Sequence, residues 1–161
     1  MAGFVDGEGY LTIMKQVRKY RPSPAFRAYV AISNTNQDVL KLFLNEYGGK
    51  VYFHYEKRLD KQGLKWSDAF TWYCPVSSSK KFLEDVIPYL RLKRRQAELI
   101  LDFIDNKNSF ARGKRKGRGG SSPLTSEEIS YREGLRRAVS QLNEKGRYAR
   151  NLKRARTESR Q

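Results

Sequence analysis

Two neighbouring stretches in which apolar and other side chains alternate restrict the fold of this chain more than any other feature. They span residues 10–17 and 26–32, and the turn-forming run Arg21-Pro22-Ser23-Pro24 separates them. Because successive side chains of a strand point to opposite faces, the two stretches predict a long hairpin with one apolar face. The apolar positions are Leu11, Ile13 and Val17 in the first stretch and Phe26, Ala28, Val30 and Ile32 in the second.

The remaining pattern adds two strands and several helices to this hairpin. Strands are expected at residues 51–58 and 66–76, and the buried side of the second stays open because both of its faces are rich in aromatics. Helices are expected at residues 1–9, at 36–47, from a cap within 77–79 to about Val86, and after Pro88. The order α-β-β-α-β-β-α predicts an α+β fold on a four-stranded antiparallel sheet. The helix after Pro88 is expected to bury Leu92, Leu99, Ile100 and Phe103.

The last third of the chain differs in composition from the rest. Residues 107–120 combine basic side chains and glycines without any acid, which predicts a flexible basic linker. A capping box at Thr125-Ser126-Glu127-Glu128 then opens a further helix to about Glu144, and a basic tail that frays follows. We therefore expect a core at residues 1–106 and an appendage of linker, C-terminal helix and tail at residues 107–161.

The net charge of +16 points to a polyanionic partner, because folding alone gives no reason to carry so much repulsion. No stretch approaches the length that spans a bilayer, so no membrane partner is expected. A single cysteine, Cys74, and a single histidine, His54, exclude an internal disulfide framework and a Cys/His zinc site within one chain. We expect an intracellular nucleic-acid-binding protein without an organic cofactor.

The acidic turn Asp6-Gly7-Glu8-Gly9 ends the first helix. Glu8 would lie at the negative pole of that helix, which is unfavourable by about 0.3–1 kcal/mol. The free carbonyls of the last turn point the same way, so the carboxylate and these oxygens would suit Mg²⁺ or a similar cation such as Mn²⁺. On spacing alone, a plain acidic turn between helix and strand is the simpler explanation.

Gly3 and Gly7 lie four residues apart and would share one face of the same helix. A face without side chains lets another backbone approach closely. If two copies of the chain pack along it, each supplies one Glu8 near the twofold axis of a homodimer. Tight packing within a single chain would explain the two glycines equally well.

The non-apolar face of the predicted sheet carries donors, acceptors and cations that suit base edges in the major groove of DNA. A solvated polar face is the alternative, and the basic excess favours nucleic acid. A basic helix start at residues 91–95 would add cations, and a lysine there could stabilise charge on a reacting phosphate. The candidate DNA-binding residues are Thr12, Gln16, Arg18, Arg27, Tyr29, Tyr52, His54, Glu56 and Arg58.

The octapeptide Ala2-Gly3-Phe4-Val5-Asp6-Gly7-Glu8-Gly9 resembles the signature of the LAGLIDADG homing endonucleases. The element order matches that family, as does the run Ile87-Pro88-Tyr89-Leu90-Arg91-Leu92-Lys93 before the penultimate core helix. The resemblance covers roughly residues 1–106, and members with a single motif act as homodimers. It implies that Glu8 binds metal with help from the Gly7 carbonyl, that Lys93 approaches the phosphate or water, that Asn34 orders water, and that Asp6 is structural.

The resemblance implies a site-specific endonuclease that makes metal-dependent double-strand breaks at a long, roughly twofold-symmetric DNA target. An RNA maturase or a catalytically inactive DNA-binding protein on the same scaffold is the alternative. We expect it in the cytoplasm or nucleoid of a prokaryote, or in an organelle. Met1 stands where leucine is usual, which indicates a short first helix or a trimmed chain, and Glu8 replaces the commoner aspartate. Residues beyond Lys107 are expected to clamp the DNA backbone.

Overall fold

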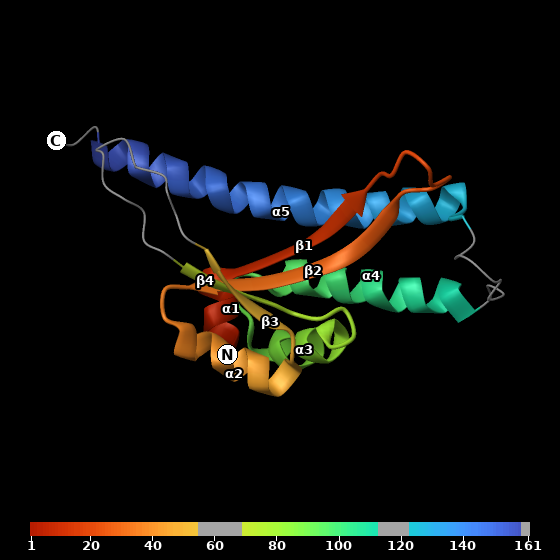
Figure 1. The fold of residues 1–161 in the computed structure, drawn as a ribbon. Coiled ribbons are helices and arrows are strands. Elements are labelled where there is room, and N and C mark those ends of the chain that lie inside the picture. The colour runs from red at the N-terminus through yellow and green to blue at the C-terminus, as the bar shows by residue number, and fades with distance from the viewer. Residues whose placement is uncertain (55–68, 113–122, 159–161) are drawn as a thin grey trace.

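The computed structural model describes residues 1–54, 69–112 and 123–158, with the backbone alone in 108–112 and 145–158. The chain forms an α+β fold in the predicted order, with helices α1 to α4 on one side of a four-stranded antiparallel sheet and α5 running along it (Figure 1). No helix in these ranges is long and apolar enough to cross a membrane. The elements are α1 (Ala2–Glu8), β1 (Gly9–Gln16), β2 (Ala25–Asn34), α2 (Gln37–Tyr47), β3 (Lys50–His54), β4 (Ala69–Tyr73), α3 (Ser79–Val86), the 3-10 turn η1 (Ile87–Tyr89), α4 (Arg94–Arg112) and α5 (Ser126–Glu158).

The sheet has the order β1-β2-β4-β3, and the predicted hairpin forms its longest pairing, from Gly9 opposite Ile32 to Gln16 opposite Ala25. The alternation is confirmed, except that Val17 is 75% exposed because β1 ends at Gln16. Of the two later strands, β3 and β4 are described, and residues 55–68 lie outside the described ranges. The expected end of the fourth strand at Val76 is wrong, because β4 ends at Tyr73. The open question about the fourth strand is settled by Trp72, which is fully buried. The core face of the hairpin consists of Leu11, Ile13, Phe26, Ala28, Val30 and Ile32.

An aromatic cluster joins the sheet to the helices beneath it. The Trp72 ring lies 5.3 Å from that of Phe43 in α2 and 5.5 Å from that of Phe82 in α3, measured between centroids. The Trp72 indole donates a hydrogen bond of 2.8 Å to the Gly48 carbonyl. Gly49 has a φ of 101°, and a Cβ there would lie 2.3 Å from the Tyr73 carbonyl. Glycine is therefore needed where α2 ends and β3 begins.

The helix starts were predicted with mixed success. The Asn36 side chain accepts a hydrogen bond of 2.9 Å from the Asp38 amide and caps α2 as expected. At α3 the expected side-chain cap is wrong, because the Ser79 hydroxyl donates to the Pro75 carbonyl instead. The expected burial of Leu92 is also wrong. Its side chain is 76% exposed, since α4 begins only at Arg94 and Leu92 lies in the connecting turn.

Helix α5 packs along β1 and adds Leu135 and Val139 to the common core. Its capping box is confirmed, with reciprocal hydrogen bonds between Thr125 and Glu128 of 2.8 and 3.2 Å. Two boundaries were predicted wrongly. Helix α4 continues through residues 107–112, which contain no glycine, and α5 continues through Gly146 to Glu158. A glycine inside a helix costs only about 1 kcal/mol, which the helix-favouring residues around Gly146 offset.

Candidate functional site

The inward side of α1 is joined to the turn before α4 by the carboxylate of Asp6. It accepts backbone hydrogen bonds from Arg91, Leu92 and Lys93, with lengths of 2.8, 3.1 and 2.9 Å. Burial alone would raise the pKa of Asp6, but the amides of Arg91, Lys93 and Leu92, with the charge of Lys93, lower it overall. These contacts agree with the structural role expected for Asp6.

The ammonium group of Lys93 binds the end of α1 at the same junction. Its Nζ atom donates to the carbonyl oxygens of Val5 at 2.9 Å and Gly9 at 2.6 Å, and lies 3.5 Å from that of Gly7. A cation at the C-terminal end of a helix is favourable, because the free carbonyls make that end negative. The expectation that these carbonyls are free is therefore wrong for Val5, and the Gly7 carbonyl has only a long contact with the ammonium.

Glu8 lies beside this junction but takes no part in it. Its side chain is exposed and makes no hydrogen bond or ion pair within the described ranges. Asn34 comes to the same end of the sheet, because it lies two residues beyond Ile32, the partner of Gly9. Its side-chain oxygen accepts a hydrogen bond of 2.8 Å from the Asn36 amide. The fold thus brings Glu8, Lys93 and Asn34 to one end of the sheet.

One described chain supplies few metal ligands at this place. Nowhere in the described residues do three or more histidine, cysteine, aspartate or glutamate side chains gather as they would around a metal ion. The oxygens that fit a hard cation are the exposed Glu8 carboxylate and the Gly7 carbonyl. Asp6 is engaged by three amides and Val5 by Lys93. A metal site here would need oxygens from another molecule.

The outward side of α1 is bare. A Cβ added to Gly3 or to Gly7 would meet nothing within 4 Å, and Phe4 beside them is 39% exposed. Tight packing within one chain therefore does not explain the two glycines. Sequence reasoning missed Gly9, where a Cβ would lie 2.4 Å from the Val5 carbonyl. The sequence signal that could have identified Gly9 was its position directly after the helix and at the start of the strand.

The sheet face away from the helices is open, and it carries most of the predicted DNA-binding residues. Arg18 lies beyond the end of β1, where its guanidinium donates to the Gln16 side chain at 3.0 Å. Glu56 and Arg58 fall outside the described ranges. The strand alternation places on this face Thr12 and Gln16 from β1, Arg27 and Tyr29 from β2, and Tyr52 and His54 from β3.

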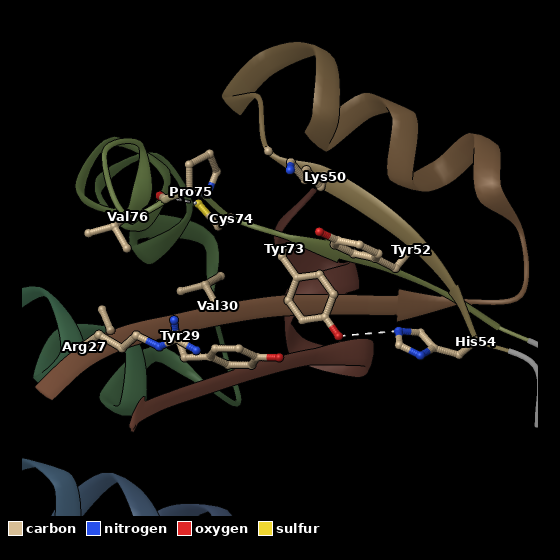
Figure 2. Close-up of a pocket in the computed structure, with 12 residues that line it drawn as sticks. Arg27, Tyr29, Val30, Lys50, Tyr52, His54, Tyr73, Cys74, Pro75 and Val76 are labelled. Atoms are coloured by element: carbon tan, nitrogen blue, oxygen red, sulfur yellow. Dashed lines mark hydrogen bonds between the residues drawn. The ribbon is translucent and has the colours of Figure 1, made fainter. Parts of the chain in front are cut away.

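Four tyrosines, one from each strand, cross this open face in a row that we call the tyrosine strip. Tyr10, Tyr29, Tyr73 and Tyr52 follow one another with ring centroids 5.9, 5.7 and 5.5 Å apart, each pair edge to face. Tyr29, Tyr73 and Tyr52 line an open hollow of about 780 Å³ (Figure 2). Burial, with the nearby Tyr73 hydroxyl, raises the pKa of Tyr29 to about 12. Tyr73 was missed because the faces of the fourth strand could not be assigned from its sequence.

No known family model matches the sequence, and no curated protein matches it. Solved structures do share its fold. The LAGLIDADG homing endonuclease I-LtrWI, bound to target DNA, has a TM-score of 0.58 at 14% identity, covering 84% of this chain and 41% of its own. I-GzeII, also a LAGLIDADG homing endonuclease in complex with a DNA target, has a TM-score of 0.53 at 17% identity. The match covers 81% of this chain and 42% of I-GzeII. The archaeal intron-encoded homing endonuclease I-Vdi141I, complexed with DNA, has a TM-score of 0.50 at 13% identity. The match covers 83% of this chain and 92% of I-Vdi141I.

These likenesses define the architecture. The chain has the LAGLIDADG homing endonuclease fold, as the octapeptide and the element order predicted. The octapeptide forms α1 and the first residue of β1, and the run at residues 87–93 forms the turn before α4.

Proposed function

We propose that this chain is a homodimeric, site-specific DNA endonuclease that cuts both strands with the help of a divalent metal ion. The observation that carries the proposal is the exposed carboxylate of Glu8 at the end of a glycine-faced helix. Asp6 and Lys93 fix the position of that helix end from the opposite side. Pairing two chains along Gly3 and Gly7 would bring the two Glu8 side chains together.

The donor set fits Mg²⁺ or Mn²⁺, because carboxylate and carbonyl oxygens are the ligands that these hard cations prefer. Glu8 and the Gly7 carbonyl of each chain would hold the metal. When bound, a divalent ion lowers the pKa of a coordinated water and polarises a phosphoryl oxygen. Lys93 holds the carbonyls of α1 in place, and Asn34 lies at the same end of the sheet to order water.

The open sheet face supports duplex DNA as the substrate. A chain with a net charge of +16 attracts phosphates, and a two-stranded ribbon fits the major groove. This chain matches 92% of I-Vdi141I but only 41% of I-LtrWI. The matched region thus corresponds to less than half of the longer endonuclease, and a second copy would supply a comparable second region.

Replacing Glu8 by glutamine tests the proposal. A bound duplex is first selected from a randomised DNA library with the full chain in EDTA, and then offered to parent and Glu8→Gln with Mg²⁺. We expect binding in EDTA to stay within about threefold and cleavage to fall by about 10³-fold or more, since the amide is a poor ligand for the metal. Glu84→Gln, an exposed glutamate on α3, is the matched control and should cut like the parent.

The outcomes separate the alternatives. Cleavage by Glu8→Gln at the parent rate would make the metal role wrong. A parent chain that binds its selected duplex tightly but never cuts it would be an inactive DNA-binding protein. Selection of RNA in preference to any DNA duplex would favour the maturase.

A further inference from the structure

The tyrosine strip goes beyond what a phosphate-binding surface needs. Phosphates are bound by cations, yet the centre of this face is built from neutral rings, Tyr29 and Tyr73. The cations Arg27 and Lys50 line the same hollow from its margins, as Figure 2 shows, with the Arg27 guanidinium carbon 6.0 Å from the Tyr29 ring centroid. A duplex lying here would meet charge at the rim and hydroxyls and rings in the middle.

Polar groups gather in the middle of the strip. The Tyr29 and Tyr73 rings pack edge to face with centroids 5.7 Å apart. The Tyr73 oxygen lies 3.4 Å from Nε2 of His54, and Figure 2 shows the Tyr29 and Tyr73 hydroxyls and the His54 ring at one side of the hollow. Each of these groups can donate or accept a hydrogen bond. Together they form a short row of hydrogen-bonding atoms supported on rigid rings.

The geometry of the strip favours paired over unpaired bases. In edge-to-face contact, the edge of one ring covers part of the face of its neighbour. Proteins that hold single strands stack bases on free aromatic faces, which this packing reduces at Tyr29 and Tyr73. Hydroxyls and ring edges suit the floor of a major groove, which presents acceptors, amino groups and the thymine methyl.

We propose that Tyr29 and Tyr73 are specificity-determining residues, whose hydroxyls read base edges of duplex DNA in the major groove. Tyr10 and Tyr52 hold the two central rings in place from the outer strands. This inference rests on the proposed function, because it takes DNA as the ligand of the open sheet face. It assigns base reading to the strip and phosphate contact to the surrounding cations.

Removing one hydroxyl at a time tests this assignment. The duplex selected from the randomised library, and its single-base variants, are titrated in EDTA with the full-length parent, Tyr29→Phe and Tyr73→Phe. We expect discrimination at one or two adjacent base pairs to fall about five- to tenfold in each variant, as for the loss of part of a base contact. The slope of affinity against salt should not change, because no phosphate contact is lost.

Two further variants serve as matched comparisons. Tyr131→Phe removes a hydroxyl that donates to Asp102 at 2.8 Å on the helical side, and it should keep the parent base preferences. Lys50→Gln removes a cation at the margin of the hollow, and it should lower the salt slope by about one while keeping the preferences. The base preference is the ratio of the affinities of one protein for two duplexes. If a variant is partly unfolded, both affinities fall by the same factor and the ratio does not change.

The outcomes distinguish this inference from the proposed function. If the parent selects a duplex but both phenylalanine variants keep its base preferences, the inference is wrong and DNA binding stands. A change in salt slope alone would make the tyrosines phosphate contacts and would also overturn it. If the parent selects no duplex at all, the proposed function fails and this inference fails with it.

Discussion

The two sides of α1 (Ala2–Glu8) have opposite surroundings. On the inward side, Val5 is fully buried, Asp6 accepts three amide hydrogen bonds and Lys93 covers the last carbonyls. On the outward side, a Cβ added to Gly3 or to Gly7 would meet nothing within 4 Å. Helix α1 is seven residues long, so both sides belong to about two turns of one helix.

A very short helix can hold an exposed side chain at a fixed place when its other side is anchored. A helix of this length is not stable in isolation, so its inward contacts must hold it. Its outward side is then free to carry groups that would not stabilise a single chain. Asp6 and Glu8 have nearly the same chemistry and lie two residues apart, yet one is fixed by amides and the other is exposed. Their positions on the helix, and not their residue type, separate their roles.

The largest expected effect comes from adding one methyl group on the inward side. Gly9→Ala would place a Cβ 2.4 Å from the Val5 carbonyl, which is backbone and cannot move aside without shifting α1. We expect a loss of about 3 kcal/mol in the free energy of unfolding, as for an overpacked site. Urea denaturation of the full chain measures it. Gly7→Ala is the outward control, and its added Cβ should affect only the association of two chains. At a protein concentration at which the chain is monomeric it should cost nothing, and equal losses in the two variants would remove the contrast between the sides.

Removing the ammonium group of Lys93 should have the next largest effect. Lys93→Met keeps most of the aliphatic chain but loses the hydrogen bonds to Val5 and Gly9. Hydrogen bonds that involve a charged group contribute about 1.5–3 kcal/mol, so we expect a loss of about 2 kcal/mol in the same measurement. Lys41→Met, at an exposed ion pair with Asp38, is the control. A Lys93→Met chain as stable as the parent would mean that the ammonium serves the chemistry alone.

The smallest expected effect concerns Asp6 and depends on pH. Asp6→Asn keeps an acceptor but loses the charge, so we expect a loss of about 1 kcal/mol at pH 7, as for a weakened helix cap. The folded-state pKa of Asp6 lies below its ordinary value of 3.8. The stabilisation is therefore fully present above that value and is lost as the pH falls through the lower folded-state pKa. The free energies of unfolding of parent and variant are measured at pH 7 and pH 3, and their difference should be smaller at pH 3. An equal difference at both pH values would contradict this role of the Asp6 charge.

Local pattern was sufficient for much of the fold. Alternation fixed both faces of the hairpin, and the caps at Asn36 and Thr125 lie where the sequence placed them. Leu92 was misassigned because helical spacing was extended backwards across the turn that follows Pro88. Local spacing ignores such a turn, whose path depends on the amides bound by Asp6.

The candidate site was predictable only in part. Glu8 follows from its place at a helix end, and the motif resemblance adds Lys93. The carbonyl contacts of Lys93 join residues more than eighty positions apart, and no local rule foresees them. Gly3 and Gly9 look alike in the sequence, and only the path of the backbone shows that one faces empty space and the other a carbonyl.

Helix α5 covers one edge of the described sheet. Strand β1 lies at an edge of the described sheet, and Asn143 of α5 donates a hydrogen bond of 3.1 Å to the Leu11 carbonyl on that edge. Lys15 of the same strand pairs with Glu133 of α5 at 3.1 Å. An uncovered edge strand invites another chain to continue the sheet and to aggregate. With α5 in place, β1 does not offer that template, so the proposed homodimer would not grow into a continuous sheet along this edge.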